Sequence, residues 1–221
     1  FFLSFFFSQY PHSHLIHPQA ILPFISKVHD VLGDGNCGFR ATAIGLGKKS
    51  DDWVEIRTQM VKELDSPNSI FHNEAFLKCN WDYSLQHCRE GLSHMSGPAQ
   101  MKNWMHFPIH GYLLADTYRR PVVLISKLSS STVLPLSHPV TLNPPIFLLL
   151  IHDMKHIVHF KFNVDIWPAS SLDPSFRWYA NEEARSWKNK IKVNLEFGKK
   201  VFATPPSRKS ARNIKTVLDV D

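Results

Sequence analysis

The feature that most constrains the fold of this chain is the glycine-rich stretch 33–40, which reads GDGNCGFR. Phe39, Ala41 and Ile44 follow at helical spacing, so the sequence predicts a loop that turns into a helix at Cys37. At the start of a helix, the dipole and the free backbone N–H groups favour a thiolate, and the same N–H groups can hold the oxyanion of acyl transfer. The stretch therefore favours a nucleophilic cysteine; the alternative is a buried structural cysteine, because free cysteines are most often buried.

Residues 34–40, DGNCGFR, resemble the Asp-Gly-Asn-Cys-x-Phe-Arg signature of the OTU (ovarian-tumour) family of cysteine deubiquitinases. The resemblance implies an α+β fold, the papain-like cysteine protease fold of OTU domains, in which helices flank a small central β-sheet. It also implies that Cys37 is the nucleophile and that the backbone amides from Asp34 to Cys37, including those of Gly35 and Asn36, form the oxyanion pocket. The pattern is closest to OTU-like domains of mobile-element-related proteins, which the helix–helix–strand order in the middle of the chain also resembles.

Composition limits the kinds of site that this chain can build. The 221 residues are 43% hydrophobic and 20% charged, as is usual for a globular protein with one substantial core. Cys37, Cys79 and Cys88 form no CxxC pair and the thirteen histidines form no HExxH pair, so we expect no disulfide scaffold, no metal and no cofactor. A free thiol at Cys37 suits a reducing compartment, cytoplasmic or nuclear, and we expect Cys79 and Cys88 to be buried structural residues.

The chain divides into three segments. Residues 1–26 are interrupted by prolines and form an irregular lead-in, 27–190 carry the OTU-like domain, and 191–221 form a basic tail that we expect to be disordered. The formal net charge is +6, and a second interpretation of the tail is weak nucleic-acid contact. We expect no membrane association, because the longest apolar run, 146–151, has only six residues. The sequence gives no indication of oligomeric state.

Local patterns predict most of the secondary structure of the domain. The predicted helices lie at 37–44, 50–64, 98–105, 111–118 and around 178–187. The predicted strands are an extended arm at 27–31, a buried strand at 122–125, an edge strand at 133–136 and a hairpin of 146–151 with 156–162. The hairpin turn over residues 152–155 places His156 at the head of the returning strand.

Two histidines compete to be the general base for Cys37. His156 fits better, because its turn and the apolar pair after it resemble the Asn-His-Phe-Val pattern of the mobile-element OTU group, although Lys155 and Ile157 depart from that pattern. His159 is the alternative base and is followed by an aromatic residue, as in many OTU proteins. The two histidines are three residues apart, so they point to opposite faces of a strand, and only one can face the thiol.

The group that orients the imidazole is not evident from the sequence. Many OTU enzymes have an acid or amide two residues after the histidine, but Val158 stands there and its side chain accepts no hydrogen bond. Asp30, in the arm before the loop, is the first candidate; Asp153, Asn163 and a backbone carbonyl are others. Asp34 is expected to shape the loop, though it is kept as a candidate member of the site.

The resemblance thus predicts a thiol protease that hydrolyses the isopeptide bond at the C-terminus of ubiquitin, on single ubiquitin or polyubiquitin chains, through an acyl-enzyme on Cys37. The alternative is a catalytically impaired OTU-like module that binds ubiquitin or associates with nucleic acid. Two features motivate this second hypothesis: Val158 stands where an acid or amide is expected, and the tail is basic.

Overall fold

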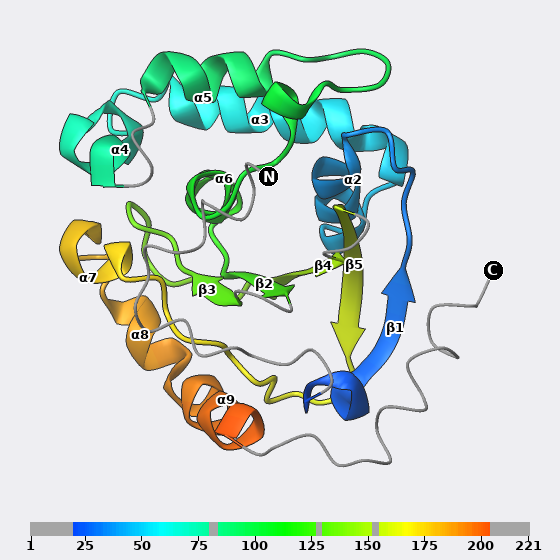
Figure 1. Cartoon of the computed structure of the whole chain (residues 1–221). Coiled ribbons are helices and arrows are strands. Elements are labelled where there is room, and N and C mark those ends of the chain that lie inside the picture. The colour runs from blue at the N-terminus through cyan, green and yellow to red at the C-terminus, as the bar shows by residue number, and fades with distance from the viewer. Residues whose placement is uncertain (1–19, 80–83, 127–129, 152–154, 204–221) are drawn as a thin grey trace.

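A five-stranded β-sheet with the strand order β1-β5-β4-β2-β3 forms the centre of the protein, in a computed structural model that describes residues 20–79, 84–126, 130–151 and 155–203 (Figure 1). The strands are β1 (Ile25–His29), β2 (Val122–Ser126), β3 (Ser131–Val133), β4 (Ile146–Ile151) and β5 (His156–Phe162). β4 and β5 pair antiparallel, which confirms the predicted hairpin, and β2 pairs parallel with β4. β3 lies at one edge of the sheet and β1 at the other, paired antiparallel with β5.

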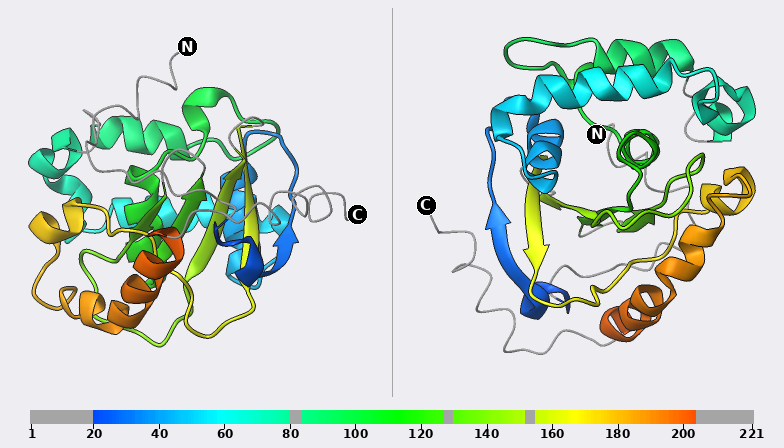
Figure 2. Two further views of the ribbon diagram at one scale, coloured as in Figure 1. Left: turned by 60° about the horizontal axis from the view of Figure 1, so that its bottom comes forward. Right: turned by 180° about the vertical axis from the view of Figure 1, so that it is seen from behind.

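Helices cover both faces of this sheet. The helices are α2 (Cys37–Gly45), α3 (Trp53–Leu64), α4 (Glu74–Cys79), α5 (Leu85–Leu92), α6 (Ile109–Tyr118), α7 (Ser175–Tyr179), α8 (Ser186–Lys190) and α9 (Lys192–Ala203). α2 and α6 lie on one face with α3 and α5 outside them, and α7, α8 and α9 lie on the other side (Figures 1 and 2). The mixed helices and five-stranded sheet confirm the expected α+β class.

The close approach of α2 to the sheet positions the site. Phe39, Ala41 and Ala43 of α2 are fully buried in the core. At the C-terminal end of the helix, a Cβ added to Gly45 would lie only 3.1 Å from the His159 ring and from Ile146, so a small residue is needed there. The helix therefore lies along β5, with its N-terminus beside the head of that strand.

Both boundaries of the predicted domain need correction. Residues 20–26, expected in the lead-in, already form a 3-10 turn at Leu22–Phe24 and the beginning of β1, so the extended arm spans 25–29 and not 27–31. The tail expected to be disordered from 191 onward begins with α9. The Asn194 carbonyl in α9 accepts a hydrogen bond from the Ala169 N–H, and the Asn194 side chain donates to the Trp167 carbonyl. These two hydrogen bonds hold the helix on the domain. Residues 1–19 and 204–221 lie outside the described part of the chain.

Three further expectations differ from the structure. The predicted helix at 98–105 is only the 3-10 turn η5 (Met101–Asn103), because the extended backbone at Gln100 and Trp104 bounds it. The predicted C-terminal helix is split into α7 and α8; Trp187 is buried, but Trp178 is 71% exposed. Cys88 is buried, as expected, and desolvation raises the pKa of its thiol to about 12, whereas Cys79 is exposed.

None of the helices in the described ranges has the length and apolar character needed to cross a bilayer.

Candidate active site

Cys37 is the first residue of α2 and lies beside the head of β5. Its Sγ accepts a hydrogen bond from the backbone N–H of Ile157 at 3.5 Å, and the thiol lies close enough to the His156 side chain to be the main influence on the pKa of that imidazole. The cysteine is only half-buried, so the sulfur remains accessible from solvent. The loop-to-helix junction predicted from the sequence therefore brings the thiol to the predicted histidine.

A carboxylate lies on the other side of the imidazole. Nε2 of His156 is 2.7 Å from Oδ1 of Asp30, which directly follows β1. With Nε2 engaged by Asp30, Nδ1 is the ring nitrogen left for the Cys37 sulfur. The pairing of His29 with His159 between β1 and β5 fixes the position of Asp30 beside the head of β5. The first candidate for the orienting group therefore contacts the histidine, despite the valine at position 158.

The electrostatics of this array favour a charged imidazole. The hydrogen bond with Cys37 raises the pKa of His156 from 6.5 to about 9; desolvation opposes this shift and the hydrogen bond with Asp30 adds to it. His156 is 7% exposed, whereas the Asp30 side chain is 78% exposed. Salt and water therefore screen the charge of Asp30 more than that of the thiol, and the main effect of this carboxylate is to fix the orientation of the ring.

We expect Asp30→Asn to lower the pKa of His156, and Cys37→Ala to lower it further, because the thiol makes the larger contribution. A pH titration of the imidazole carbon resonances by NMR would measure both changes. Asp165→Asn, an exposed position beyond the far end of β5, is the matched control and should leave the pKa unchanged. An unchanged His156 pKa in Asp30→Asn would contradict the assigned contact.

His159 lies away from the thiol. Its ring faces Gly45, at the opposite end of α2 from Cys37, and its centre lies 5.4 Å from that of the His29 ring, with the two rings tilted by 46°. Burial, with the nearby charges of His29 and Lys161, lowers the pKa of His159 to about 4, so the ring is neutral at physiological pH. Its Nδ1 has no hydrogen-bond partner among the described residues.

Asp34 lies within the loop network and not beside the imidazole. Its carboxylate accepts hydrogen bonds from Arg40, at 2.8 Å for the closest pair, and from the backbone and side chain of Asn36. Burial works against the charged form, but these hydrogen bonds outweigh it and keep the pKa of Asp34 below its ordinary value. The hydrogen bonds of Asp34 therefore shape the loop, and its carboxylate does not contact the imidazole.

One of the backbone amides expected to form an oxyanion pocket is already engaged within the loop. The N–H of Asn36 donates to Oδ1 of Asp34 at 3.0 Å, so this amide is not free to bind an oxyanion. The N–H groups of Gly35 and Cys37 make no hydrogen bond within the described residues, and the first N–H of a helix has no intrahelical partner. Gly35 has a φ of +81° and lies against the Ala99 carbonyl, where a Cβ would clash. The available donors are therefore the amides of Gly35 and Cys37.

The other candidate acceptors do not join the array. Asn163 follows the far end of β5, where its side chain donates to the Pro23 carbonyl at 3.3 Å. Asp153 lies outside the described residues, as does most of the hairpin turn.

Arg57 lies beside the loop and was not among the residues predicted for the site. It is fully buried, and its guanidinium donates to Oδ1 of Asn36 at 2.9 Å. A signal existed in the sequence: Arg57 lies four residues after Trp53 and three before Met60, on the face of α3 that is otherwise apolar. A cation in such a stripe indicates a buried polar partner.

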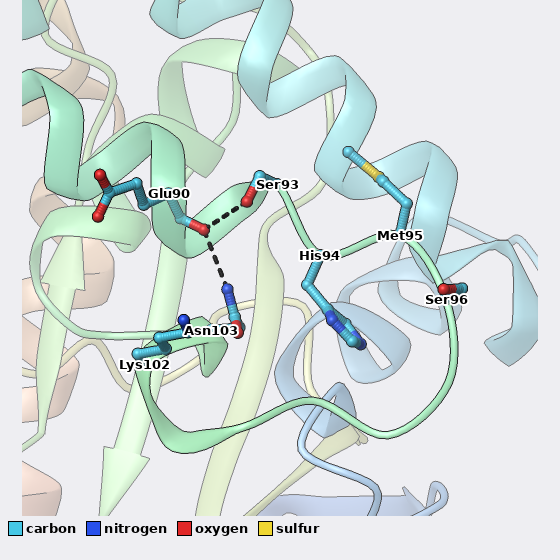
Figure 3. Close-up of a pocket in the computed structure, with 7 residues that line it drawn as sticks. All are labelled: Glu90, Ser93, His94, Met95, Ser96, Lys102 and Asn103. Carbon is cyan, nitrogen blue, oxygen red and sulfur yellow. Dashed lines mark hydrogen bonds between the residues drawn. The ribbon is translucent and has the colours of Figure 1, made fainter.

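Two other kinds of site were sought in the described parts of the chain. No group of three or more His, Cys, Asp or Glu side chains there is placed to hold a metal ion. A surface hollow of about 510 Å³ lies between the end of α5 and η5, lined by Glu90, Ser93, His94, Met95, Ser96, Lys102 and Asn103 (Figure 3). The Glu90 carbonyl accepts hydrogen bonds from Ser93 and Asn103 there, so this hollow is separate from the Cys37 array.

No protein-family model matches the chain, and no curated protein matches it either. Several solved structures are similar to it. The viral OTU domain protease from Dera Ghazi Khan virus is 15% identical with a TM-score of 0.47, covering 64% of this chain and 83% of its own. The Hazara virus OTU bound to ubiquitin is 13% identical (TM-score 0.47; 65% and 85% covered), and the OTUD1 OTU domain is 18% identical (TM-score 0.44; 61% and 84% covered). All three of these solved structures are OTU domains.

Proposed function

We propose that this protein is an OTU-type cysteine isopeptidase that removes ubiquitin or a ubiquitin-like modifier from lysine side chains. One observation carries the proposal: the imidazole of His156 interacts with the Cys37 thiol, which is the main influence on its pKa, and its Nε2 lies 2.7 Å from the Asp30 carboxylate. A nucleophile, a base and a group that orients the base are the parts that thiol acyl transfer requires. The identity of the modifier comes from residues 34–40, which resemble the deubiquitinase signature.

The proposed reaction begins with the thiolate of Cys37 paired with the imidazolium of His156. The sulfur attacks the carbonyl carbon of the modifier's C-terminal glycine, and the amides of Gly35 and Cys37 stabilise the resulting oxyanion. The C–N bond then breaks as His156 transfers its proton to the leaving lysine amine, which leaves a thioester on Cys37. Neutral His156 next takes one proton from water as the water oxygen displaces the sulfur, which restores the ion pair. The carboxylic acid that is released gives its remaining proton to solvent and departs as the carboxylate.

The alternative hypothesis is a catalytically impaired module that binds ubiquitin or associates with nucleic acid. Its chief motive was Val158, whose side chain accepts no hydrogen bond. The Asp30 carboxylate weakens that motive, because it forms with the imidazole a hydrogen bond of the kind that Val158 cannot form. The residues of the basic tail from 204 onward lie outside the described part of the chain, so no structural observation favours nucleic acid. A free thiol nucleophile suits a reducing compartment, and the proposed location is cytoplasmic or nuclear.

The test is covalent capture of the wild-type full chain by ubiquitin that carries an electrophile in place of its C-terminal carboxylate. We expect one ubiquitin to be added per chain, and peptide mapping to locate the bond at Cys37. A panel of ubiquitin chains of defined linkage, followed by gel electrophoresis, should show cleavage that depends on reducing agent. Absence of both capture and cleavage, with the same probe reacting on a known deubiquitinase, would overturn the proposal.

A further inference from the structure

Arg57 is a fully buried cation that joins four segments around the Cys37 loop. It comes from α3, and one terminal nitrogen donates to the carbonyl of Gly91, at the end of α5, at 2.9 Å. The other donates to the Asn103 carbonyl in η5 at 2.8 Å and to Oδ1 of Asn36 at 2.9 Å. The guanidinium also lies 3.7 Å above the centre of the Phe39 ring, in the first turn of α2.

Burying the charge of Arg57 costs free energy of folding. Burial lowers the pKa of Arg57 to about 10, which the nearby charge of Asp34 only partly offsets, so the side chain is still charged at neutral pH. Its Nε has no hydrogen-bond partner in the described ranges. Replacing a buried charge by a well-packed apolar side chain is often neutral or stabilising, so stability alone gives a weak reason for an arginine here.

Asn36 transmits the contacts of Arg57 to the nucleophile. The Asn36 side chain is fully buried; its amide nitrogen donates to the Gly97 carbonyl at 3.1 Å and to Asp34 at 3.2 Å. Arg57 donates to the side-chain oxygen of Asn36, so both polar atoms of this side chain are hydrogen bonded. The peptide that joins Asn36 to Cys37 carries the N–H that is proposed to hold the oxyanion, so fixing Asn36 fixes the direction of that donor.

We propose that Arg57 is a positioning residue that orients the Asn36–Cys37 peptide for oxyanion stabilisation. This inference rests on the proposed function for its catalytic readout. Arg57 does not touch the thiol, His156 or Asp30 through any contact described above, so it acts through Asn36. Lysine keeps the charge but has no planar fork, and it cannot donate to Gly91, Asn103 and Asn36 in the same geometry.

Arg57→Lys in the full chain is the central variant. We expect kcat for hydrolysis of a fluorogenic ubiquitin C-terminal amide to fall about 100-fold, the effect of losing one oxyanion donor, with KM changed less than about threefold. The pH profile of Cys37 alkylation by iodoacetamide should not change, because His156 and Asp30 are held by the strands. Hydrogen exchange followed by mass spectrometry should be faster in the peptide that contains residues 34–37.

Two further variants separate positioning from general destabilisation. Met60→Ala makes a cavity on the same buried face of α3, and we expect it to lower the melting temperature while kcat below that temperature stays within about threefold of wild type. In an Asn36→Ala background, Arg57→Lys should cost much less than 100-fold, because the residue through which it acts is already gone.

Unchanged kcat in Arg57→Lys, or an equal loss with and without Asn36, would overturn the positioning role, and so would a shifted alkylation profile. The outcome stays interpretable if wild-type protein turns over no ubiquitin substrate. In that case the proposed function fails, and hydrogen exchange in residues 34–37 decides the matter for Arg57: faster exchange in Arg57→Lys supports the inference, and unchanged exchange overturns it.

Discussion

Cys37→Ala is expected to abolish both capture by the ubiquitin electrophile and hydrolysis of ubiquitin chains. Among the described residues, Cys37 is the cysteine that a histidine contacts, and its position at the start of α2 leaves backbone N–H groups free for the oxyanion. Alanine removes the nucleophile without adding volume, so the fold should be retained. Gel-based probe labelling and a fluorogenic ubiquitin substrate would measure the loss, with circular dichroism as the check on folding.

Cys79→Ala is the matched control for that experiment. Cys79 is exposed, which makes it the strongest competitor for a reactive probe, and its sulfur accepts a hydrogen bond from the Tyr179 hydroxyl at 3.2 Å. Among the residues that the structure describes, no imidazole contacts it, and it lies at the C-terminal end of α4 rather than at a helix N-terminus. Full labelling and turnover in Cys79→Ala, with none in Cys37→Ala, is the expected pattern. Labelling lost only in Cys79→Ala would refute the assignment of the nucleophile.

Short-range patterns allowed the central hairpin and the Cys37 helix to be predicted correctly. The bounds of β4 and β5 agree with the apolar runs at 146–151 and 156–162, because both strands are rich in apolar residues and a turn separates them. The helix at Cys37 ends at Gly45, as the glycines at its end indicated. These features depend on residues close to one another in the chain, which is the range over which sequence patterns are informative.

The orienting group could be narrowed to a few candidates but not chosen from the sequence. Asp30 and His156 are 126 residues apart, and the register between β1 and β5 decides whether they meet. A one-residue slip in that register would turn the side chains of β1 to the other face of the sheet. No local pattern reports this register, so Asp30 could be ranked first but Asp153 and Asn163 could not be excluded from the sequence.

Buried polar contacts were the other feature that could not be predicted from the sequence. Arg57 lies on a helix face that packs against η5 and the end of α5, and two of its three acceptors are backbone carbonyls. Every residue carries such a carbonyl, so sequence identity gives no clue to which one is used. The same limit explains α9, whose docking depends on backbone contacts with residue 169 that basic composition alone does not reveal.

His156→Ala is expected to lower kcat/KM for a ubiquitin substrate by at least about 10³-fold, because the imidazole both favours the thiolate and protonates the leaving amine. His159→Ala is the matched variant on the same strand, and we expect it to stay within about threefold of wild type. With a pKa lowered to about 4, His159 is neutral at the assay pH, and it faces Gly45, eight residues or about 12 Å further along the axis of α2 than Cys37.

The comparison of these two variants decides which histidine is the base, provided that both are assayed below their melting temperatures. Both histidines are buried, so each truncation leaves a cavity and is expected to lower the melting temperature. Activity should therefore separate the two variants where stability does not: below their melting temperatures, His159→Ala should be active and His156→Ala inactive. Probe labelling that survives in His156→Ala and is lost in folded His159→Ala would reassign the base to His159. That outcome would also require β5 to turn its other face to the thiol, because the two side chains lie on opposite faces of the strand.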